Sequence, residues 1–230
     1  MENLQNICLQ IIGKYIMILC DIGNTTFHFL VGNDEFKVSI TEDLDRLEFD
    51  NFDSSEIYFI SVNSDGKEKF KKKFPNSIDL GNNLNFNTTY SNTLGIDRII
   101  ACKFIENGII VDFGSAVTVD IVENNIHLGG SIMAGFDMLK MNYPNISNKL
   151  KFDFQENLDL NKLPTNTDEA ISFAILNMIV LPIKEMQKRY NQKLIITGET
   201  SKYFLPYFDN FEFRNRLIFE SMKKIIEEQK

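Results

Sequence analysis

Short apolar runs alternate along the chain with segments of helical periodicity, a pattern typical of α/β proteins. In the first half we expect strands near residues 15–20, 25–32, 35–40 and 56–61, and helices near 64–74 and 95–106. In the second half we expect strands near 108–113, 116–123, 126–132 and 193–197, and helices from Gly135, over about 167–190 and near 215–228. The pattern predicts two α/β lobes, residues 1–104 and 105–230.

The longest predicted helix carries unusually few polar positions. Thr167, followed by Asp168 and Glu169, is expected to cap the helix start and to place negative charge at its positive end. The apolar residues between 171 and 180 leave little polar face. We therefore expect this helix in the core or at a subunit interface, and a homodimer as the assembly.

An internal repeat divides the chain. Residues 18–27 and 109–118 both read as an apolar strand, then Asp-x-Gly with a small polar residue, then a second strand. Alone, either copy is typical of an ordinary turn. Together, Asp21 and Asp112 would bring two carboxylates beside backbone that a ligand can approach closely. Two such hairpins could clamp a triphosphate in a cleft between the lobes while each carboxylate orients a cation.

Composition narrows the function classes. With 43% hydrophobic and 24% charged residues among 230, the chain is expected to fold as a soluble protein. A net charge of −8 argues against nucleic acid and anionic membranes as partners. The longest apolar stretch, 170–183, is shorter than the roughly 20 residues of a membrane span.

Cysteine usage and the first residues point to a cytoplasmic protein. Cys8, Cys20 and Cys102 are too few and too far apart for a disulfide framework or a zinc site. Glu2 and Lys14 do not fit a signal peptide, so we interpret the first residues as an extension before the first strand.

Six motifs in order resemble the type III pantothenate kinases of the actin-like sugar-kinase superfamily. The resemblance runs from about Ile16 almost to the C-terminus. It implies a two-lobed actin-like, ribonuclease H-like α/β fold with duplicated mixed-sheet domains and a central cleft. The motifs are Asp21–Thr25, Gly95–Arg98, Asp112–Asp120, Gly129–Gly135, Asn166–Ile171 and Ile196–Gly198.

Phosphoryl transfer to an alcohol needs a proton acceptor and a held acceptor molecule. Asp97 is the candidate catalytic base, and the guanidinium of Arg98 suits the carboxylate of pantothenate. Gly95 lets the backbone come close, and Ile96 completes this substrate motif. The alternative is structural: Asp97 and Arg98 could simply cap and pair at the start of the helix that they open.

The resemblance implies ATP, Mg²⁺ and K⁺ (or NH₄⁺) as cofactors, and pantothenate as the substrate. Asp112 would hold the monovalent cation, Asp21 would orient Mg²⁺ through water, and Tyr90 and Thr167 would line the pantothenate pocket. Packing and helix capping explain those last two residues equally well. The ATP contacts would come from Asp21, Ile22, Gly23, Asn24, Thr25, Thr26 and Ser115.

Three positions depart from the family pattern: Ser115 stands where Thr is usual, Ala134 replaces a common Pro, and Glu199 follows Gly198 in place of a second Gly. They motivate one alternative, a nucleotide-binding regulator or scaffold without turnover. Another alternative keeps the fold but phosphorylates a sugar or a short carboxylate.

His28 and His127 lack metal-ligand spacing, so packing or surface roles are expected. The lysines of 67–73 are interpreted as a solvated face.

Overall fold

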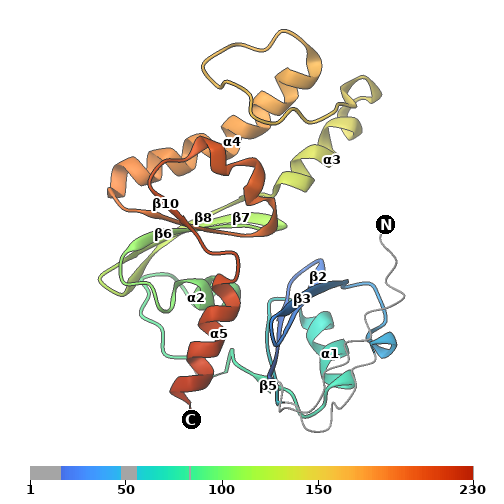
Figure 1. The fold of residues 1–230 in the computed structure, drawn as a ribbon, viewed down its shortest axis with the longest axis vertical. Helices are drawn as coiled ribbons and strands as arrows, with labels where there is room; N and C mark the ends of the chain where they lie inside the picture. The colour runs from blue at the N-terminus through green and yellow to red at the C-terminus, as the bar shows by residue number, and fades with distance from the viewer. Residues whose placement is uncertain (1–16, 48–55, 83, 230) are drawn as a thin grey trace. The chain divides into compact units, whose positions relative to one another are not determined.

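The computed structural model describes residues 17–47, 56–82 and 84–229 (Figure 1). The predicted N-terminal extension lies outside these residues. The chain forms two compact units that are not continuous stretches of sequence. Unit 1 contains residues 1–85, 95–100 and 218–230, and unit 2 contains 86–94 and 101–217. The single boundary at 104/105 therefore stays a prediction, and each unit is described by itself.

Unit 1 is built on a five-stranded mixed sheet of order β3-β2-β1-β4-β5. β1 pairs antiparallel with β2, which pairs antiparallel with β3, while β4 and β5 continue the sheet in parallel on the other side of β1. The strands are β1 (Met17–Ile22), β2 (Thr26–Val31), β3 (Asp34–Ser39), β4 (Glu56–Ser61) and β5 (Ile78–Asp79).

Aromatic packing holds α1 (Ser64–Lys73) against this sheet (Figure 1). The Phe70 ring lies 5.1 Å from that of Phe59 and 6.0 Å from that of Phe29, and all three side chains are fully buried. Each such ring contributes roughly 1.5–3 kcal/mol of burial free energy. α5 (Leu217–Glu228) also belongs to this unit from residue 218 onward, and its Phe219 lies edge-on to His28 of β2.

Unit 2 carries a second five-stranded sheet, of order β8-β7-β6-β9-β10. β6 pairs antiparallel with β7 and β7 with β8, while β9 and β10 add in parallel on the other side of β6. The strands are β6 (Gly108–Phe113), β7 (Ala116–Glu123), β8 (Ile126–Ala134), β9 (Leu194–Thr197) and β10 (Phe211–Phe213). This is the connectivity of the unit 1 sheet, so the repeat in sequence is a repeat in structure.

The long helix α4 (Thr167–Tyr190) lies across one face of the second sheet (Figure 1). Its Ile175, Leu176, Ile179, Val180 and Ile183 are buried in one cluster with residues of β6, β7 and β9. The expected burial of this helix in a core is confirmed, although Met178 and Leu181 remain 45% and 56% exposed.

The remaining helices complete the fold. α2 (Ile96–Cys102) follows the segment 86–94, and α3 (Phe136–Ile146) follows β8. Short 3₁₀ turns are η2 (Leu44–Arg46), η4 (Asn148–Leu150), η5 (Glu199–Tyr203) and η6 (Leu205–Tyr207). β5 and β10 were not anticipated, because strands of two or three residues leave almost no periodic signal.

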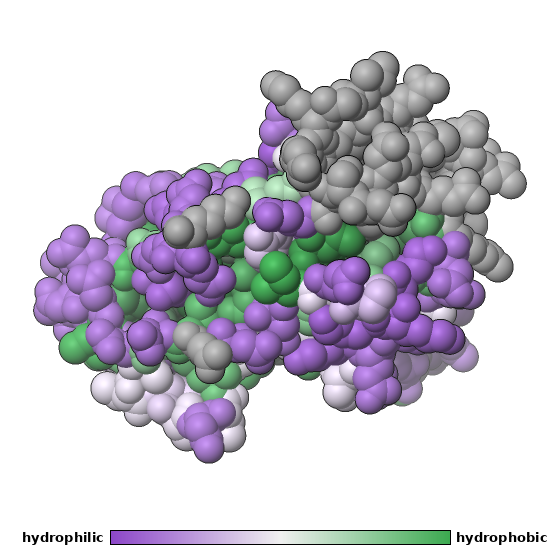
Figure 2. Space-filling view, turned by 90° about the horizontal axis from the view of Figure 1, so that it is seen from below, coloured by the Kyte–Doolittle hydropathy of each residue, from purple (hydrophilic) through white to green (hydrophobic). Residues whose placement is uncertain are grey.

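The two mixed sheets and their helices confirm the predicted α/β class with duplicated domains. Polar side chains dominate much of the described surface on the face shown in Figure 2. No helix in the described part of the chain has the length and apolar character that a membrane crossing requires.

Candidate functional site

The first Asp-x-Gly motif forms the turn between β1 and β2. Asp21 is the fifth of six residues in β1, where its neighbours are His28 of β2 and Ile60 of β4. The Gly23 N–H donates to the Thr26 carbonyl at 2.9 Å, which closes the turn. Asn24 is exposed at its tip. The turn therefore presents polar groups and backbone to solvent next to a carboxylate.

The thiol of Cys20, the residue before Asp21, has low reactivity. Cys20 is fully buried, and burial raises the pKa of its thiol well above the usual value, with the negative charge of Asp21 as the second cause. The thiol therefore stays protonated at neutral pH and is a poor nucleophile. Of these two neighbours, only Asp21 offers a charged group to a cation.

The second motif forms the equivalent turn between β6 and β7. Asp112 is again the fifth of six residues in its strand and lies between Thr118 of β7 and Thr197 of β9. The Gly114 N–H donates to the Ala116 carbonyl at 3.1 Å, and Ser115 is exposed at the tip. The residues predicted from the repeat thus occupy matching places in the two sheets.

Two glycines pack their backbone against this second turn. A Cβ atom on Gly135 would overlap the carbonyl oxygens of Ser115 and Gly114. A Cβ on Gly198 would lie 2.6 Å from Asp112 Oδ1, and Gly198 has φ +94°, a conformation that other residues rarely adopt. The structure therefore brings three of the six sequence motifs together within unit 2.

In unit 1, Val62 links the first turn to the Gly95–Arg98 motif. Its N–H donates to the Ile22 carbonyl at 3.1 Å, and its Cγ1 lies 4.0 Å from the place of a Cβ on Gly95. That Cβ would also lie 2.5 Å from Asp97 Oδ1, so glycine leaves room for the carboxylate to fold back.

Asp97 and Arg98 open α2. Asp97 Oδ1 accepts a hydrogen bond from the Arg98 N–H at 2.8 Å, and the Arg98 side chain is only 5% exposed. Asp97 is the second residue of α2 and binds the amide of the next residue, so this bond is not an N-cap bond, but it orients a half-buried carboxylate. This orientation is compatible with a catalytic role, because a base must be held in place before it can accept a proton.

Tyr90 and Thr167 both reach the surface of unit 2. Tyr90 is 36% exposed, in the segment between β5 and α2. The expected cap at Thr167 is wrong: Asn166 precedes the helix, and its Oδ1 accepts from the Glu169 N–H at 3.0 Å. Asparagine is as good a cap as threonine, and it stands one residue earlier. The exposed Thr167 hydroxyl is not needed to cap α4.

The departures from the family pattern lie next to the second turn. Ala134 is the exposed last residue of β8, directly before Gly135. Glu199 is exposed and begins η5 directly after Gly198. Ser115 keeps the hydroxyl at the tip of the turn. None of these substitutions distorts the β6–β7 register around Asp112.

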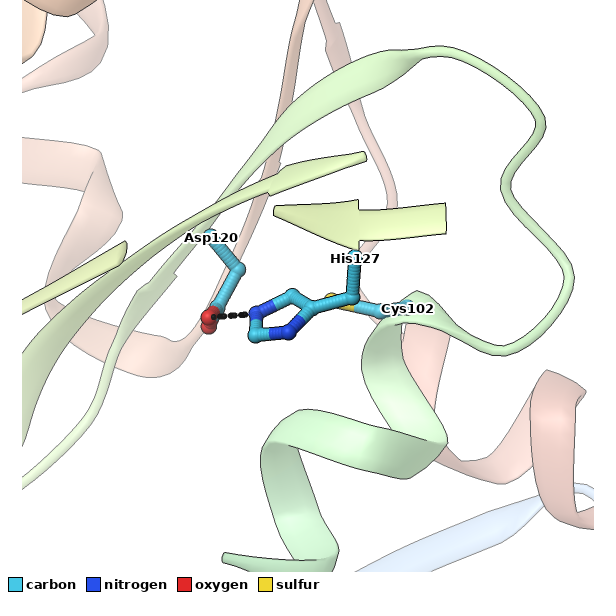
Figure 3. Close-up of side chains that lie close together, drawn as sticks. All are labelled: Cys102, Asp120 and His127. Atoms are coloured by element: carbon cyan, nitrogen blue, oxygen red, sulfur yellow. Dashed lines mark hydrogen bonds and ion pairs between the residues drawn. The ribbon is translucent and has the colours of Figure 1, made fainter. Parts of the chain in front are cut away.

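Sequence reasoning overlooked one buried polar group. His127 of β8 is fully buried, and its Nε2 lies 2.7 Å from Oδ1 of the buried Asp120 of β7. Cys102 adds a thiol, so that three potential metal-ligand atoms lie within 4.8 Å of one another (Figure 3). The available signal was an acidic residue between the apolar residues Val119 and Ile121 of a predicted strand.

The oxygen donors present suit the implied cations. Mg²⁺ prefers carboxylates and water, and Asp21 stands beside an exposed polar turn. Asp112 lies against the backbone of Gly198, and the Ala116 carbonyl oxygen and the Asp112 carboxylate both lie within 4 Å of the place of a Cβ on Gly114. These residues therefore fit Mg²⁺ and a monovalent cation.

Comparison with known proteins points to one family. The model of the type III pantothenate kinase family matches residues 67–189. The type III pantothenate kinase of Campylobacter jejuni strain RM1221 is 43% identical over 92% of this chain and 97% of its own length. That of Wolinella succinogenes is 37% identical over 93% and 98%.

Solved structures show the same fold. A protein from Campylobacter jejuni, described as a Baf family transcriptional activator, superposes with a TM-score of 0.77 at 38% identity, over 92% of this chain and 98% of its own. MreB 5 of Spiroplasma citri bound to AMPPNP, at 10% identity and TM-score 0.51 over 94% and 98%, shares the actin-like fold alone. Because the family model spans more than half of the sequence and the relatives cover nearly all of it, this chain belongs to the type III pantothenate kinase family.

Proposed function

We propose that the protein transfers the γ-phosphate of ATP to the primary hydroxyl of pantothenate, which gives 4′-phosphopantothenate, the first intermediate on the route to coenzyme A. Membership of the family supports this reaction. The observation that carries it is the duplicated turn, in which Asp21 and Asp112 occupy the same position of the same sheet topology.

The first turn would bind the ATP phosphates. Backbone amides and hydroxyls of residues 21–26 are suited to phosphate oxygens because the turn is polar and exposed at its tip. Ser115 would contribute a hydroxyl from the second turn. When bound near Asp21, Mg²⁺ would neutralise charge on the phosphates that develops during transfer.

Asp97 would act as the base. As the pantothenate oxygen attacks the γ-phosphorus, its proton passes to the Asp97 carboxylate, and the bond from phosphorus to the bridging oxygen of ADP breaks. The hydrogen bond from the Arg98 N–H orients this carboxylate. Arg98, Tyr90 and Thr167 would hold the acceptor, with the guanidinium directed to its carboxylate.

The finer assignments follow from the same residues. Asp112 would bind K⁺ or NH₄⁺. The exposed Met178 and Leu181 of α4 would form part of a homodimer interface, which a mass measurement by light scattering tests. A biosynthetic kinase that uses ATP and pantothenate would work in the cytoplasm.

The test is a coupled assay of ADP formation, run with and without pantothenate and with and without K⁺. We expect ADP release only when ATP, Mg²⁺, K⁺ and pantothenate are all present. A panel of sugars and short carboxylates replaces pantothenate in parallel reactions. Faster turnover with one of these acceptors would reassign the substrate but keep the kinase.

A second candidate is a nucleotide-binding regulator without turnover. The description of the Campylobacter jejuni structure as a transcriptional activator, together with Glu199 and Ala134, favours examining it. ATP binding measured by calorimetry without any pantothenate-dependent ADP release would support the regulator. Turnover in the coupled assay would eliminate the non-catalytic alternative.

A further inference from the structure

The buried group formed by Asp120, His127 and Cys102 has no part in the reaction described above. Asp120 extends from β7 and His127 from β8, and Figure 3 shows Asp120 and Cys102 on different sides of the imidazole ring. His127 is fully buried and Asp120 is 1% exposed. Burying such groups is costly unless hydrogen bonds compensate, so their partners indicate what the group does.

Both ring nitrogens of His127 have hydrogen-bond partners. Nε2 lies 2.7 Å from Asp120 Oδ1, and Nδ1 lies 2.7 Å from the hydroxyl of Thr88. A carboxylate only accepts, so Nε2 donates to Asp120, and Nδ1 shares a hydrogen bond with the Thr88 hydroxyl. Asp120 thereby fixes the orientation of the ring.

Thr88 connects His127 to Tyr90 through hydrogen bonds. The Thr88 hydroxyl accepts the Tyr90 N–H at 2.9 Å and also shares a hydrogen bond with Nδ1 of His127. The Tyr90 ring lies 6.0 Å from the His127 ring and packs beside Gly129, where a Cβ would lie 3.8 Å from Tyr90 Cδ2. A continuous path of contacts therefore runs from Asp120 through His127 and Thr88 to Tyr90.

The segment around Thr88 makes further hydrogen bonds to β8, among them one from the Thr89 hydroxyl to the Leu128 carbonyl at 2.9 Å. Thr88 forms an isolated parallel bridge with His127, the Thr89 N–H donates to the His127 carbonyl at 3.0 Å, and the His127 N–H donates to Asn87 at 2.9 Å. Residues 89–95 have no regular secondary structure. Without the side-chain path, the conformation at Tyr90 would depend on these bonds and on ring packing.

A metal centre is the competing explanation. Two ligands of one tetrahedral zinc ion, bonded at about 2.0–2.2 Å, lie roughly 3.3 Å apart. The 2.7 Å between His127 Nε2 and Asp120 Oδ1 is shorter and matches a charge-assisted hydrogen bond. With Thr88 on the other nitrogen, the ring is already satisfied by protein groups.

We propose that Asp120, His127 and Thr88 are positioning residues that hold Tyr90 in the conformation that binds the acceptor substrate. This inference rests on the proposed function, because it assigns Tyr90 to the pantothenate pocket. Because the path of contacts ends at Tyr90, the three residues act on acceptor affinity and not on the chemical step.

Two pairs of variants separate the steps of the path. Thr88→Val removes the hydroxyl at constant shape, and Thr88→Ser restores it. His127→Asn keeps a polar atom near the place of Nδ1, whereas His127→Gln keeps one near Nε2 and loses the bond to Thr88. Cys102→Ala is the control, since it changes a buried neighbour outside the path.

In steady-state kinetics, Thr88→Val and His127→Gln should raise the KM for pantothenate about fivefold. Their kcat and the KM for ATP should stay within about twofold, and Thr88→Ser and Cys102→Ala should match the wild type. Equal losses of kcat in all variants, together with lower melting temperatures, would reduce the group to a structural role and overturn the proposal.

Hydrogen exchange provides a readout independent of activity. In the ligand-free wild type, the Tyr90 amide should be protected by its bond to Thr88, and Thr88→Val should accelerate its exchange. Unchanged exchange would overturn the path itself. If the wild type never releases ADP with pantothenate, the proposed function fails, while the exchange experiment still decides whether the path holds Tyr90.

The metal content of the purified protein distinguishes the positioning role from a metal site. Purified wild-type protein should contain no stoichiometric zinc. One zinc per chain, lost in Cys102→Ala, would replace the positioning path by a metal site.

Discussion

The two units share one sheet topology but close their Asp-x-Gly turns differently. Four residues separate the last paired residues of β1 and β2, Ile22 and Phe27, whereas three separate Phe113 and Val117 of β6 and β7. The unit 1 turn is therefore longer and more polar. The unit 2 turn is tighter and is enclosed by neighbouring backbone.

Matching positions around the turns carry different residues. Directly after the third strand, unit 1 has Ile40, whose N–H donates to Thr25, while unit 2 has Gly135 packed on Ser115. On the parallel strand, the residue after the partner of the aspartate is Ser61 in unit 1 and Gly198 in unit 2. Glycine removes the Cβ atoms that would keep backbone away from Asp112.

The difference between the two turns suggests that they bind different ligands. The open turn of unit 1 can wrap around phosphate oxygens with its amides and hydroxyls. The enclosed turn of unit 2 surrounds one carboxylate with backbone, an environment suited to a weakly hydrated cation. The proposed proton acceptor, Asp97, lies in neither turn.

Asp97→Asn should give the largest effect. Asparagine keeps an oxygen that can accept the Arg98 N–H but cannot take a proton, so kcat should fall by about 10²–10⁴-fold with an unchanged melting temperature. Single-turnover measurement of ADP release checks this. Activity near that of the wild type would remove Asp97 from the chemical step.

Asp21→Asn and Asp112→Asn should separate the two turns. We expect Asp21→Asn to lower kcat about a hundredfold and to raise the Mg²⁺ concentration needed for half-maximal rate. Asp112→Asn should instead raise the K⁺ requirement about tenfold and leave the Mg²⁺ dependence in place. Titrations of both cations on both variants measure this. Identical profiles would show that the turns are not specialised.

Glycine substitutions test how tightly each turn is enclosed. Gly198→Ala forces a side chain into φ +94° and against Asp112, so it should destabilise the protein by roughly 1–3 kcal/mol or more. Gly23→Ala places its Cβ 3.5 Å from the Thr26 oxygen, an ordinary contact, and is the matched control. Thermal unfolding that ranks the two variants equally would contradict the proposed contrast.

The smallest expected effect is the loss of stability when an ion pair on an edge strand is removed. The pKa of Glu212 on β10 is lowered by its hydrogen bond from Lys193, by the charge of Lys193 and by that of Arg214. A lowered folded-state pKa stabilises the protein above the unfolded value of about 4.3, and the stabilisation is lost as pH falls through the folded pKa.

Lys193→Met should therefore cost about 0.2–1 kcal/mol at pH 7 and almost nothing at strongly acidic pH. The matching pair in unit 1 joins Lys67 to the less exposed Asp79 of β5 at 2.6 Å, so Lys67→Met should cost more. Denaturant unfolding at both pH values measures the two differences. A larger cost for Lys193→Met would reverse this comparison of the edges.

The alternation of strands and helices, the duplicated Asp-x-Gly turns and the family could all be predicted from the amino-acid sequence. These features depend on local periodicity, on turn chemistry and on ordered motifs, all of which are written along the chain. The helix start at residue 167 was predicted with the wrong cap, because Asn166 and Thr167 are both good caps and only the backbone conformation distinguishes them.

Contacts between residues far apart in the sequence could not be predicted, because they depend on how the strands pair. The pairing of Asp120 with His127 depends on an irregular register between β7 and β8 near Ile121 and Val122, and on a left-handed Gly129. A one-residue shift in register turns side chains to the opposite face, so isolated histidine spacing could not reveal that pair. The same holds for Gly135 and Gly198, whose contacts with the second turn join segments that only the folded sheet brings together.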